Sequence, residues 1–149
     1  MEYYLKTAQW EDMDLLFVWA NDPAVRRNSF SSKEILYEEH QVWYQKLLSD
    51  PDRRQYLYMH NGVPVGQARI AVSGDIAEIS YGICAEKRGT GHGKRLLCLL
   101  PGQIKKDFPQ VKYLAANVLT GNTASANAFL RAGYQKAYEI YKMECKRMF

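Results

Sequence analysis

The chain has little cysteine, no long apolar run and no large excess of either charge. No apolar stretch approaches the roughly 18 residues that a membrane-spanning helix needs, so we expect no membrane partner. The opening residues, MEYYLKTAQWED, contain no basic stretch leading into an apolar run, which argues against a secretory leader and favours the cytoplasm. Twenty basic residues stand against 16 acidic ones and no basic run exceeds two residues, which disfavours nucleic acid as a partner.

Metal-ligating residues are also scarce. Cys84, Cys98 and Cys145 are too few and too far apart for a zinc site, and their odd number argues against a disulfide framework. The three histidines show no ligand spacing, so we predict no metal. A phosphorylated small molecule explains the mild net charge of +4 with fewer assumptions than nucleic acid does.

The chain length of 149 residues and the 47% hydrophobic content predict one globular domain over residues 1–149. Helical spacing of apolar residues predicts helices over 10–19, 94–108 and 123–132, with a short helical turn at 25–28. A further helix is expected to begin at Ser32, which can cap it, and to end at Asp50–Pro51. Alternation and turn residues predict strands over 3–7, 55–59, 64–72, 76–85, 112–118 and 135–146. Pro101–Gly102 should kink or break its helix.

The resulting order, β-α-α-β-β-β-α-β-α-β, is typical of a mixed α/β (α+β) sheet. Turns at Asn61–Gly62 and Ser73–Asp75 join the three middle strands into an antiparallel meander. A right-handed helical crossover then leads to a parallel strand. The exposed edge of the last strand could pair in a homodimer.

Three glycines between a strand and a helix form the most informative motif. Gly89, Gly91 and Gly93 allow close approach of a ligand, and the next helix offers free N–H groups to a phosphate. Arg88 and Lys94 add positive charge. The spacing fits neither G-x-G-x-x-G nor a Walker loop, and a flexible solvent loop is the alternative.

The spacing R-x-x-G-x-G, formed by Arg88, Gly91 and Gly93, resembles the GNAT superfamily of acyl-CoA-dependent N-acyltransferases. A second motif of that superfamily is N-x-x-(A/S)-x-x-x-(Y/F)-x-x-x-G-(F/Y). It is matched here by Asn122, Ser125, Phe129, Gly133 and Tyr134. Both motifs occur in the family's order, and the likeness covers most of the chain from Val63 onward.

The resemblance implies acetyl-CoA as cosubstrate. The pyrophosphate would bind to the loop residues Arg88, Gly89, Thr90, Gly91, His92, Gly93 and Lys94. A bulge would splay the preceding strand, so that backbone groups of Tyr81, Gly82 and Ile83 pair with pantetheine and polarise the thioester carbonyl. Asn122 and Asn127 would contact the CoA arm, although Asn122 is also suited to capping a helix.

Transfer to an amine needs a base, and Glu78 resembles the strand glutamate that serves as base in the histone-acetylating branch. The alternatives are a glutamate on a solvated sheet face, or Asp75 as base. Two positions depart from the family: Asn117 replaces a frequent glutamate, and Phe129 replaces a frequent tyrosine acid. The thiolate would then leave unassisted, or be protonated by Tyr81, Tyr134 or Tyr138.

The N-terminal third carries the acceptor side. Residues 19–26, 28–31 and 39–44 resemble the branch that acetylates amino groups of nucleotide-linked sugars, including pseudaminic-type sugars. We predict hydrogen bonds from Asn28 and Ser29, contacts from Phe30, His40 and Trp43, and a diphosphate held by Arg26, Arg27 or Arg53. Trp43 in the core and His40 on a helix surface are the plainer interpretations. The alternative functions are acetylation of a protein N-terminus or polyamine, and a CoA-binding module without turnover.

Overall fold

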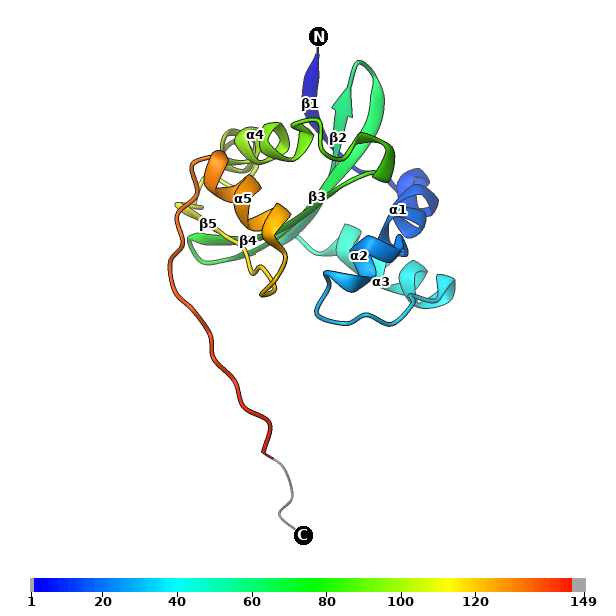
Figure 1. Cartoon of the computed structure of the whole chain (residues 1–149). Helices are drawn as coiled ribbons and strands as arrows, with labels where there is room; N and C mark the ends of the chain where they lie inside the picture. Colours follow the sequence, from blue (N-terminus) through cyan, green and yellow to red (C-terminus); the bar gives the residue numbers. More distant parts are fainter. Residues whose placement is uncertain (1, 146–149) are drawn as a thin grey trace.

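The computed structural model describes residues 2–145 and contains one mixed five-stranded sheet (Figure 1). The strands are β1 (Tyr3–Thr7), β2 (Arg53–His60), β3 (Val63–Ser73), β4 (Ile76–Ile83) and β5 (Tyr113–Ala115). They lie in the order β1-β2-β3-β4-β5, with antiparallel pairs except for the parallel pair β4–β5. The predicted mixed α/β fold, with its meander and crossover, is confirmed.

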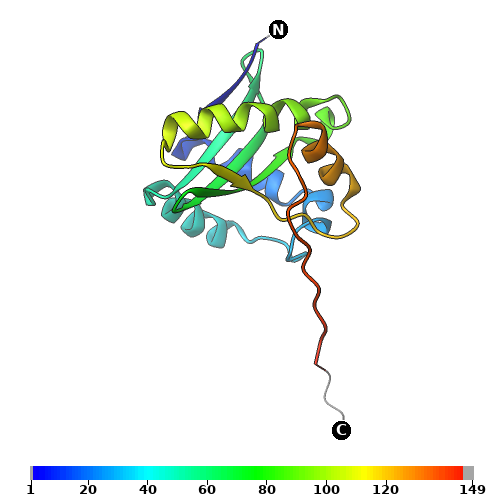
Figure 2. The same ribbon diagram turned by 90° about the vertical axis from the view of Figure 1, so that its left-hand side faces the viewer.

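Helices cover both faces of this sheet (Figure 2). They are α1 (Met13–Ala20), α2 (Pro23–Arg27), α3 (Tyr37–Ser49), α4 (His92–Asp107) and α5 (Thr123–Arg131), with short 3-10 turns at Trp10–Asp12 and Ala85–Lys87. The helix α4 packs Leu96, Leu97 and Leu100 against the larger core, on one face. A smaller core lies between α1, α3 and β2 on the other face, around Tyr44 and Leu57. Within residues 2–145, no helix is long and apolar enough to cross a membrane.

The hairpin between β2 and β3 forms where the sequence predicts it. Asn61 and Gly62 both have positive φ, 51° and 81°, as the tight turn requires. The predicted alternation along 55–59 is wrong, because every residue of that stretch is buried. The strand β2 lies inside the sheet with helices on both faces, so neither of its sides meets water.

Two details of the predicted helices need correction. The helix α3 begins at Tyr37 with Leu36 as its cap, and Ser32 lies in the loop before it. Backbone atoms of this loop are bound elsewhere: Asn21 pairs with both the N–H and the carbonyl of Ile35 at 2.8 Å. The helix α4 continues through Pro101 from His92 to Asp107, so the predicted break into two pieces is wrong.

The last predicted strand, 135–146, is absent from residues 135–145, and residue 146 lies outside the described residues. This segment runs away from the body of the molecule (Figures 1 and 2). Tyr138, Ile140, Tyr141 and Met143 are 72–90% exposed. Alternation of apolar and polar residues indicates extended backbone, but a strand also needs a neighbouring strand with which to form hydrogen bonds. The strand β5, which precedes this segment in the chain, is only three residues long.

Candidate active site

The glycine loop leads directly into α4. Gly89 and Gly91 have φ of 77° and 88°, conformations that residues with a side chain rarely adopt, and Gly91 caps the helix. The first helical bond to this cap runs from the Arg95 N–H to the Gly91 carbonyl. The N–H groups of His92, Gly93 and Lys94 therefore have no intrahelical acceptor, and they fit a pyrophosphate at the positive end of the helix dipole.

The side chains of the loop are partly engaged with the protein itself. The Thr90 hydroxyl donates to the Lys87 carbonyl at 2.7 Å. His92 is buried, and its Nδ1 lies 2.9 Å from the Tyr58 hydroxyl. Burial lowers the pKa of His92, helped by the neighbouring charge of Arg95. Of the predicted loop contacts, backbone groups are therefore better placed than the His92 ring to meet a phosphate.

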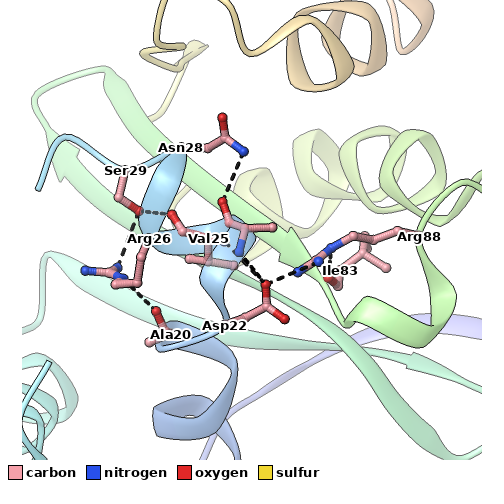
Figure 3. Close-up of polar contacts among 9 residues, drawn as sticks. Ala20, Asp22, Val25, Arg26, Asn28, Ser29, Ile83 and Arg88 are labelled. Atoms are coloured by element: carbon pink, nitrogen blue, oxygen red, sulfur yellow. Dashed lines mark hydrogen bonds and ion pairs between the residues drawn. The ribbon is translucent and has the colours of Figure 1, made fainter. Parts of the chain in front are cut away.

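Arg88 anchors the start of the loop (Figure 3). Its Nε donates to the Ile83 carbonyl at 3.0 Å, and its Nη1 lies 3.3 Å from the Asp22 carboxylate. Asp22 also caps α2 by accepting the Ala24 N–H at 2.9 Å. Burial alone would raise the pKa of Asp22, but the Ala24 hydrogen bond and the Arg88 charge outweigh it and lower the pKa. Asp22 was not among the site residues expected from the sequence.

The strands β4 and β5 separate just before the loop. They pair only from Ile76 to Glu78, whereas β4 continues to Ile83. This confirms the predicted splay, although the β3–β4 register runs without a shift, so a bulge against β3 is not its cause. The Cys84 N–H bonds to β3, and alternate residues turn to alternate sides. Backbone groups of Tyr81 and Ile83 therefore face the open side, and those of Gly82 face β3.

Glu78 lies where the two strands part. Its side chain is exposed on the face of β4 opposite α4, and Asn117 donates to its Oε1 at 3.2 Å. The sequence analysis considered Asn117 only as the loss of a possible base. Because β4 and β5 are parallel and adjacent, a residue just after β5 reaches the end of their paired segment. Asn117 thereby holds the Glu78 carboxylate in one orientation.

Phe129 sits between two tyrosines instead of offering a proton. Its ring packs edge-on against Tyr81 at 5.4 Å and Tyr134 at 5.1 Å. The Tyr81 hydroxyl donates to Ser125 at 3.4 Å, and the Tyr134 hydroxyl donates to the Leu97 carbonyl at 3.3 Å. Burial raises the pKa of Tyr81, and it raises the pKa of Tyr134 to about 12. Tyr138 is exposed on the C-terminal segment.

The second motif forms the helix α5. Asn122 caps this helix by accepting the Ser125 N–H at 3.3 Å, which is the capping role weighed for it. Asn127 lies on α5, exposed. The glycine loop and α5 thus both lie beside Tyr81: an added Cβ at Gly93 would lie 3.5 Å from its ring, and its hydroxyl donates to Ser125. Tyr81 belongs to the part of β4 that β5 leaves unpaired, as the resemblance implies for a CoA site.

Comparison with known proteins decides the family. The family described as "Acetyltransferase (GNAT) domain" matches residues 3–135. The chain belongs to the GNAT acetyltransferase family. As a GNAT enzyme it is an acetyl-CoA-dependent N-acetyltransferase, and acetyl-CoA is its cosubstrate. No curated protein matches this chain.

Solved structures share the fold of this GNAT enzyme. The aminoglycoside acetyltransferase AAC(6')-Ib, in complex with paromomycin and acetyl-CoA, has a TM-score of 0.80 and 18% identity over 92% of this chain and 85% of that one. Spermidine N-acetyltransferase from Vibrio cholerae, with CoA and spermine, has a TM-score of 0.78 and 15% identity over 88% and 79%. A possible acetyltransferase from Clostridium difficile 630 has a TM-score of 0.74 and 17% identity over 99% and 100%.

In the N-terminal third of the GNAT enzyme, Arg26 organises the loop after α2 (Figure 3). Its guanidinium donates to the carbonyls of Ala20, Ser31 and Lys33 and to the Ser29 hydroxyl. Ser29 in turn donates to the Val25 carbonyl, and the Asn28 amide donates to Ala24. Phe30 is 75% exposed beside them.

His40 and Trp43 differ in their surroundings, although both belong to α3. His40 is only 4% exposed, and its Nε2 is buried without a hydrogen-bond partner among the described residues. Burial lowers the pKa of His40 and also leaves its ring out of reach of an acceptor. Trp43 is half-buried, and guanidinium carbons of Arg53 and Arg69 lie 5.8 and 5.0 Å from its ring centre. Arg69 was not among the residues expected from the sequence.

No group of three or more histidine, cysteine, aspartate or glutamate side chains that could hold a metal occurs among residues 2–145.

Proposed function

We propose that the enzyme transfers an acetyl group from acetyl-CoA to a primary amine on a nucleotide-linked amino sugar, with Glu78 as the base. The observation that carries this proposal is the place of Glu78. It lies on an exposed strand face, fixed by Asn117, immediately before β4 loses its neighbour. An amine arriving on that face would lie between the carboxylate and the backbone that is suited to pantetheine.

The chemistry follows from these positions. Glu78 would take the proton of the amine, directly or through a water molecule, so that the neutral amine can attack the thioester carbonyl. A backbone N–H on the open side of β4, from Tyr81 or Ile83, would stabilise the oxyanion. The thiolate would leave without an acid at Phe129, since thiols titrate close enough to neutral pH for the anion to depart.

The acceptor is proposed from the residues facing the same side. Asn28 and Ser29 are short hydrogen-bonding side chains, and the exposed ring of Phe30 is suited to stacking on a base or sugar. The cytoplasm is the proposed compartment, because it would supply both acetyl-CoA and a nucleotide-linked sugar. His40 lies in the core, so it is not proposed to contact the acceptor.

The experiment is thiol release from acetyl-CoA with a panel of acceptors: nucleotide-linked amino sugars, free amino sugars, polyamines, an aminoglycoside and peptides with free N-termini. We expect release with the nucleotide-linked amino sugars at least tenfold above the others. Thiol release with peptides or polyamines alone would contradict the proposed acceptor, but it would still support acetyl transfer to an amine. Tight acetyl-CoA binding with no release across the panel would favour the binding module without turnover.

A further inference from the structure

We propose that Arg53 and Arg69, held against the indole of Trp43, form a subsite for the diphosphate of the acceptor and exclude polycationic amines. The inference rests on the proposed function, because it places this subsite on the same open sheet face as Glu78. It adds a specificity-determining residue, Arg69, to the acceptor site.

The sheet brings the two arginines together. Arg53 begins β2 and Arg69 lies in β3, where Arg53 pairs with Ala71 and Gln55 pairs with Arg69. Both side chains therefore project from one face of the sheet, the face on which α3 packs. Their guanidinium carbons lie 5.8 and 5.0 Å from the centre of the Trp43 ring. Stacking on an indole orients a guanidinium and leaves its N–H groups available to an anion.

Two other arginines on this side of the molecule already have partners in the protein. Arg26 donates to three backbone carbonyls, and Arg88 pairs with Asp22. Neither Arg53 nor Arg69 has a carboxylate within 4.0 Å among the described residues. The exposed Arg27 of α2 also lacks such a partner there, but only Arg53 and Arg69 stack on Trp43.

Positive charge accumulates at this place, and no carboxylate of the described residues pairs directly with Arg53 or Arg69. Crowding by protein atoms lowers the pKa of Arg69, the charges of Arg53 and Arg26 lower it further, and Glu78 acts against them. Guanidinium groups that repel one another are stabilised by a bound oxyanion, which each of them can meet with two parallel N–H donors. A polyamine or an aminoglycoside would instead add positive charge to the cluster.

The distance to the base fits a single small acceptor. In the β3–β4 register Arg69 pairs with Ser80, and Glu78 pairs with Ala71, so Arg69 and Glu78 are diagonal neighbours on one face. Such diagonal pairs lie roughly 7–8 Å apart. An amino sugar joined to a diphosphate spans about this length, so its amine could meet Glu78 while its phosphates meet Arg69 and Arg53.

Trp43 also borders a shallow hollow whose other lining residues are Glu38, Glu39, Val42 and Lys46 of α3. Its two carboxylates make it the competing place for a cationic acceptor on this side of the molecule. The experiment must therefore compare an anionic ligand with a cationic one.

The test is calorimetric binding of UDP, glucuronate and spermidine to the full chain saturated with CoA, which keeps the glycine loop occupied. We expect UDP to bind at least tenfold more tightly than glucuronate or spermidine. Arg53→Gln and Arg69→Gln should each weaken UDP binding about tenfold, and Arg69→Lys should weaken it less. Lys106→Gln, which removes a positive charge from α4 on the other face of the sheet, is the matched control and should change nothing.

Several results would overturn the subsite: UDP binding unchanged in Arg69→Gln, equal affinity for UDP and glucuronate, or tighter binding of spermidine than of UDP. Unfolding midpoints of the variants, compared with the wild type, show whether a loss of binding reflects a loss of fold, and Arg69→Lys retains the charge if the glutamine variant is unstable. Arginine-dependent UDP binding without turnover of any amine would contradict the proposed function and leave the subsite standing. Turnover of nucleotide-linked sugars that is unchanged in both arginine variants would contradict the subsite and leave the proposed function standing.

Discussion

Glu78 and Asn117 show what a side chain gains from its place in the sheet. In the sequence they are 39 positions apart. The parallel pairing of β4 and β5 brings them within 3.2 Å. Glu78 became a candidate through its resemblance to the strand glutamate of the histone-acetylating branch, whereas its partner could be found only from the pairing register, which the sequence does not state.

Phe129 provides a test at the same scale. Phe129→Tyr should retain acetyl transfer within about threefold, because the proposed chemistry uses no acid at this position and Tyr81 and Tyr134 already border the ring. The measurement is kcat with the best acceptor, alongside acetyl-CoA affinity. Loss of all turnover with acetyl-CoA binding intact would count against this account of the leaving group.

At the scale of elements, local signals were reliable where one short segment fixes its own shape. The Asn61–Gly62 turn, the glycine loop before α4 and the asparagine cap of α5 all depend on residues a few positions apart. Long-range contacts were not predictable in this way. Hydrogen bonds from Asn21 and Arg26 hold the backbone of the loop before α3, so this helix begins only at Tyr37. No sequence motif indicated a role for Arg69, because that role depends on its contact with Trp43, which lies on a different element.

The glycine loop makes a prediction about α4. Gly91→Ala should raise the KM for acetyl-CoA about tenfold, because a Cβ at φ 88° costs roughly 1–2 kcal/mol and tilts the cap away from the phosphate. Gly102→Ala, inside the same helix with φ in the ordinary range and no neighbour within 4 Å of the added Cβ, is the matched control and should leave the KM unchanged. An unchanged KM in Gly91→Ala would show that the left-handed cap is not needed for CoA binding.

Across the whole molecule, two layers of helices leave part of the sheet uncovered. The helices α1 and α3 pack on β2, whereas Arg69, Glu78 and Ser80 on the same face of β3 and β4 remain exposed. The Arg88–Asp22 pair joins the start of the glycine loop to the N-terminal end of α2. The homodimer stays a prediction, but the strand edge through which it was expected to form is absent from residues 135–145.

Global stability should depend on acid through Asp107, which joins α4 to β2. Burial alone would raise its pKa, but hydrogen bonds from Tyr56 and Gln103 and the charge of Arg54 lower it below 3.8. A lowered folded pKa adds stability above pH 3.8 that is lost as the pH falls through the folded value. Asp107→Asn should therefore cost about 1–2 kcal/mol near neutral pH and much less in strong acid.

Denaturant unfolding of wild type and Asp107→Asn at about pH 6 and about pH 2.5 measures this difference. Asp52→Asn, whose side chain is exposed on the turn before β2, is a control for the loss of one carboxylate. A difference between wild type and Asp107→Asn that stays constant across this range would show that the carboxylate contributes no more than a neutral amide does.

The most direct measurement for the central claim, that Glu78 removes the amine proton during acetyl transfer, is turnover by Glu78→Gln set beside its binding of acetyl-CoA. Glutamine keeps the size of the side chain and an oxygen that can accept from Asn117, but it cannot take a proton. We predict that kcat falls by about 10²–10⁴ while the affinity for acetyl-CoA stays within twofold. Turnover equal to that of the wild type, with acetyl-CoA bound equally well, would contradict the assignment of Glu78 as the base.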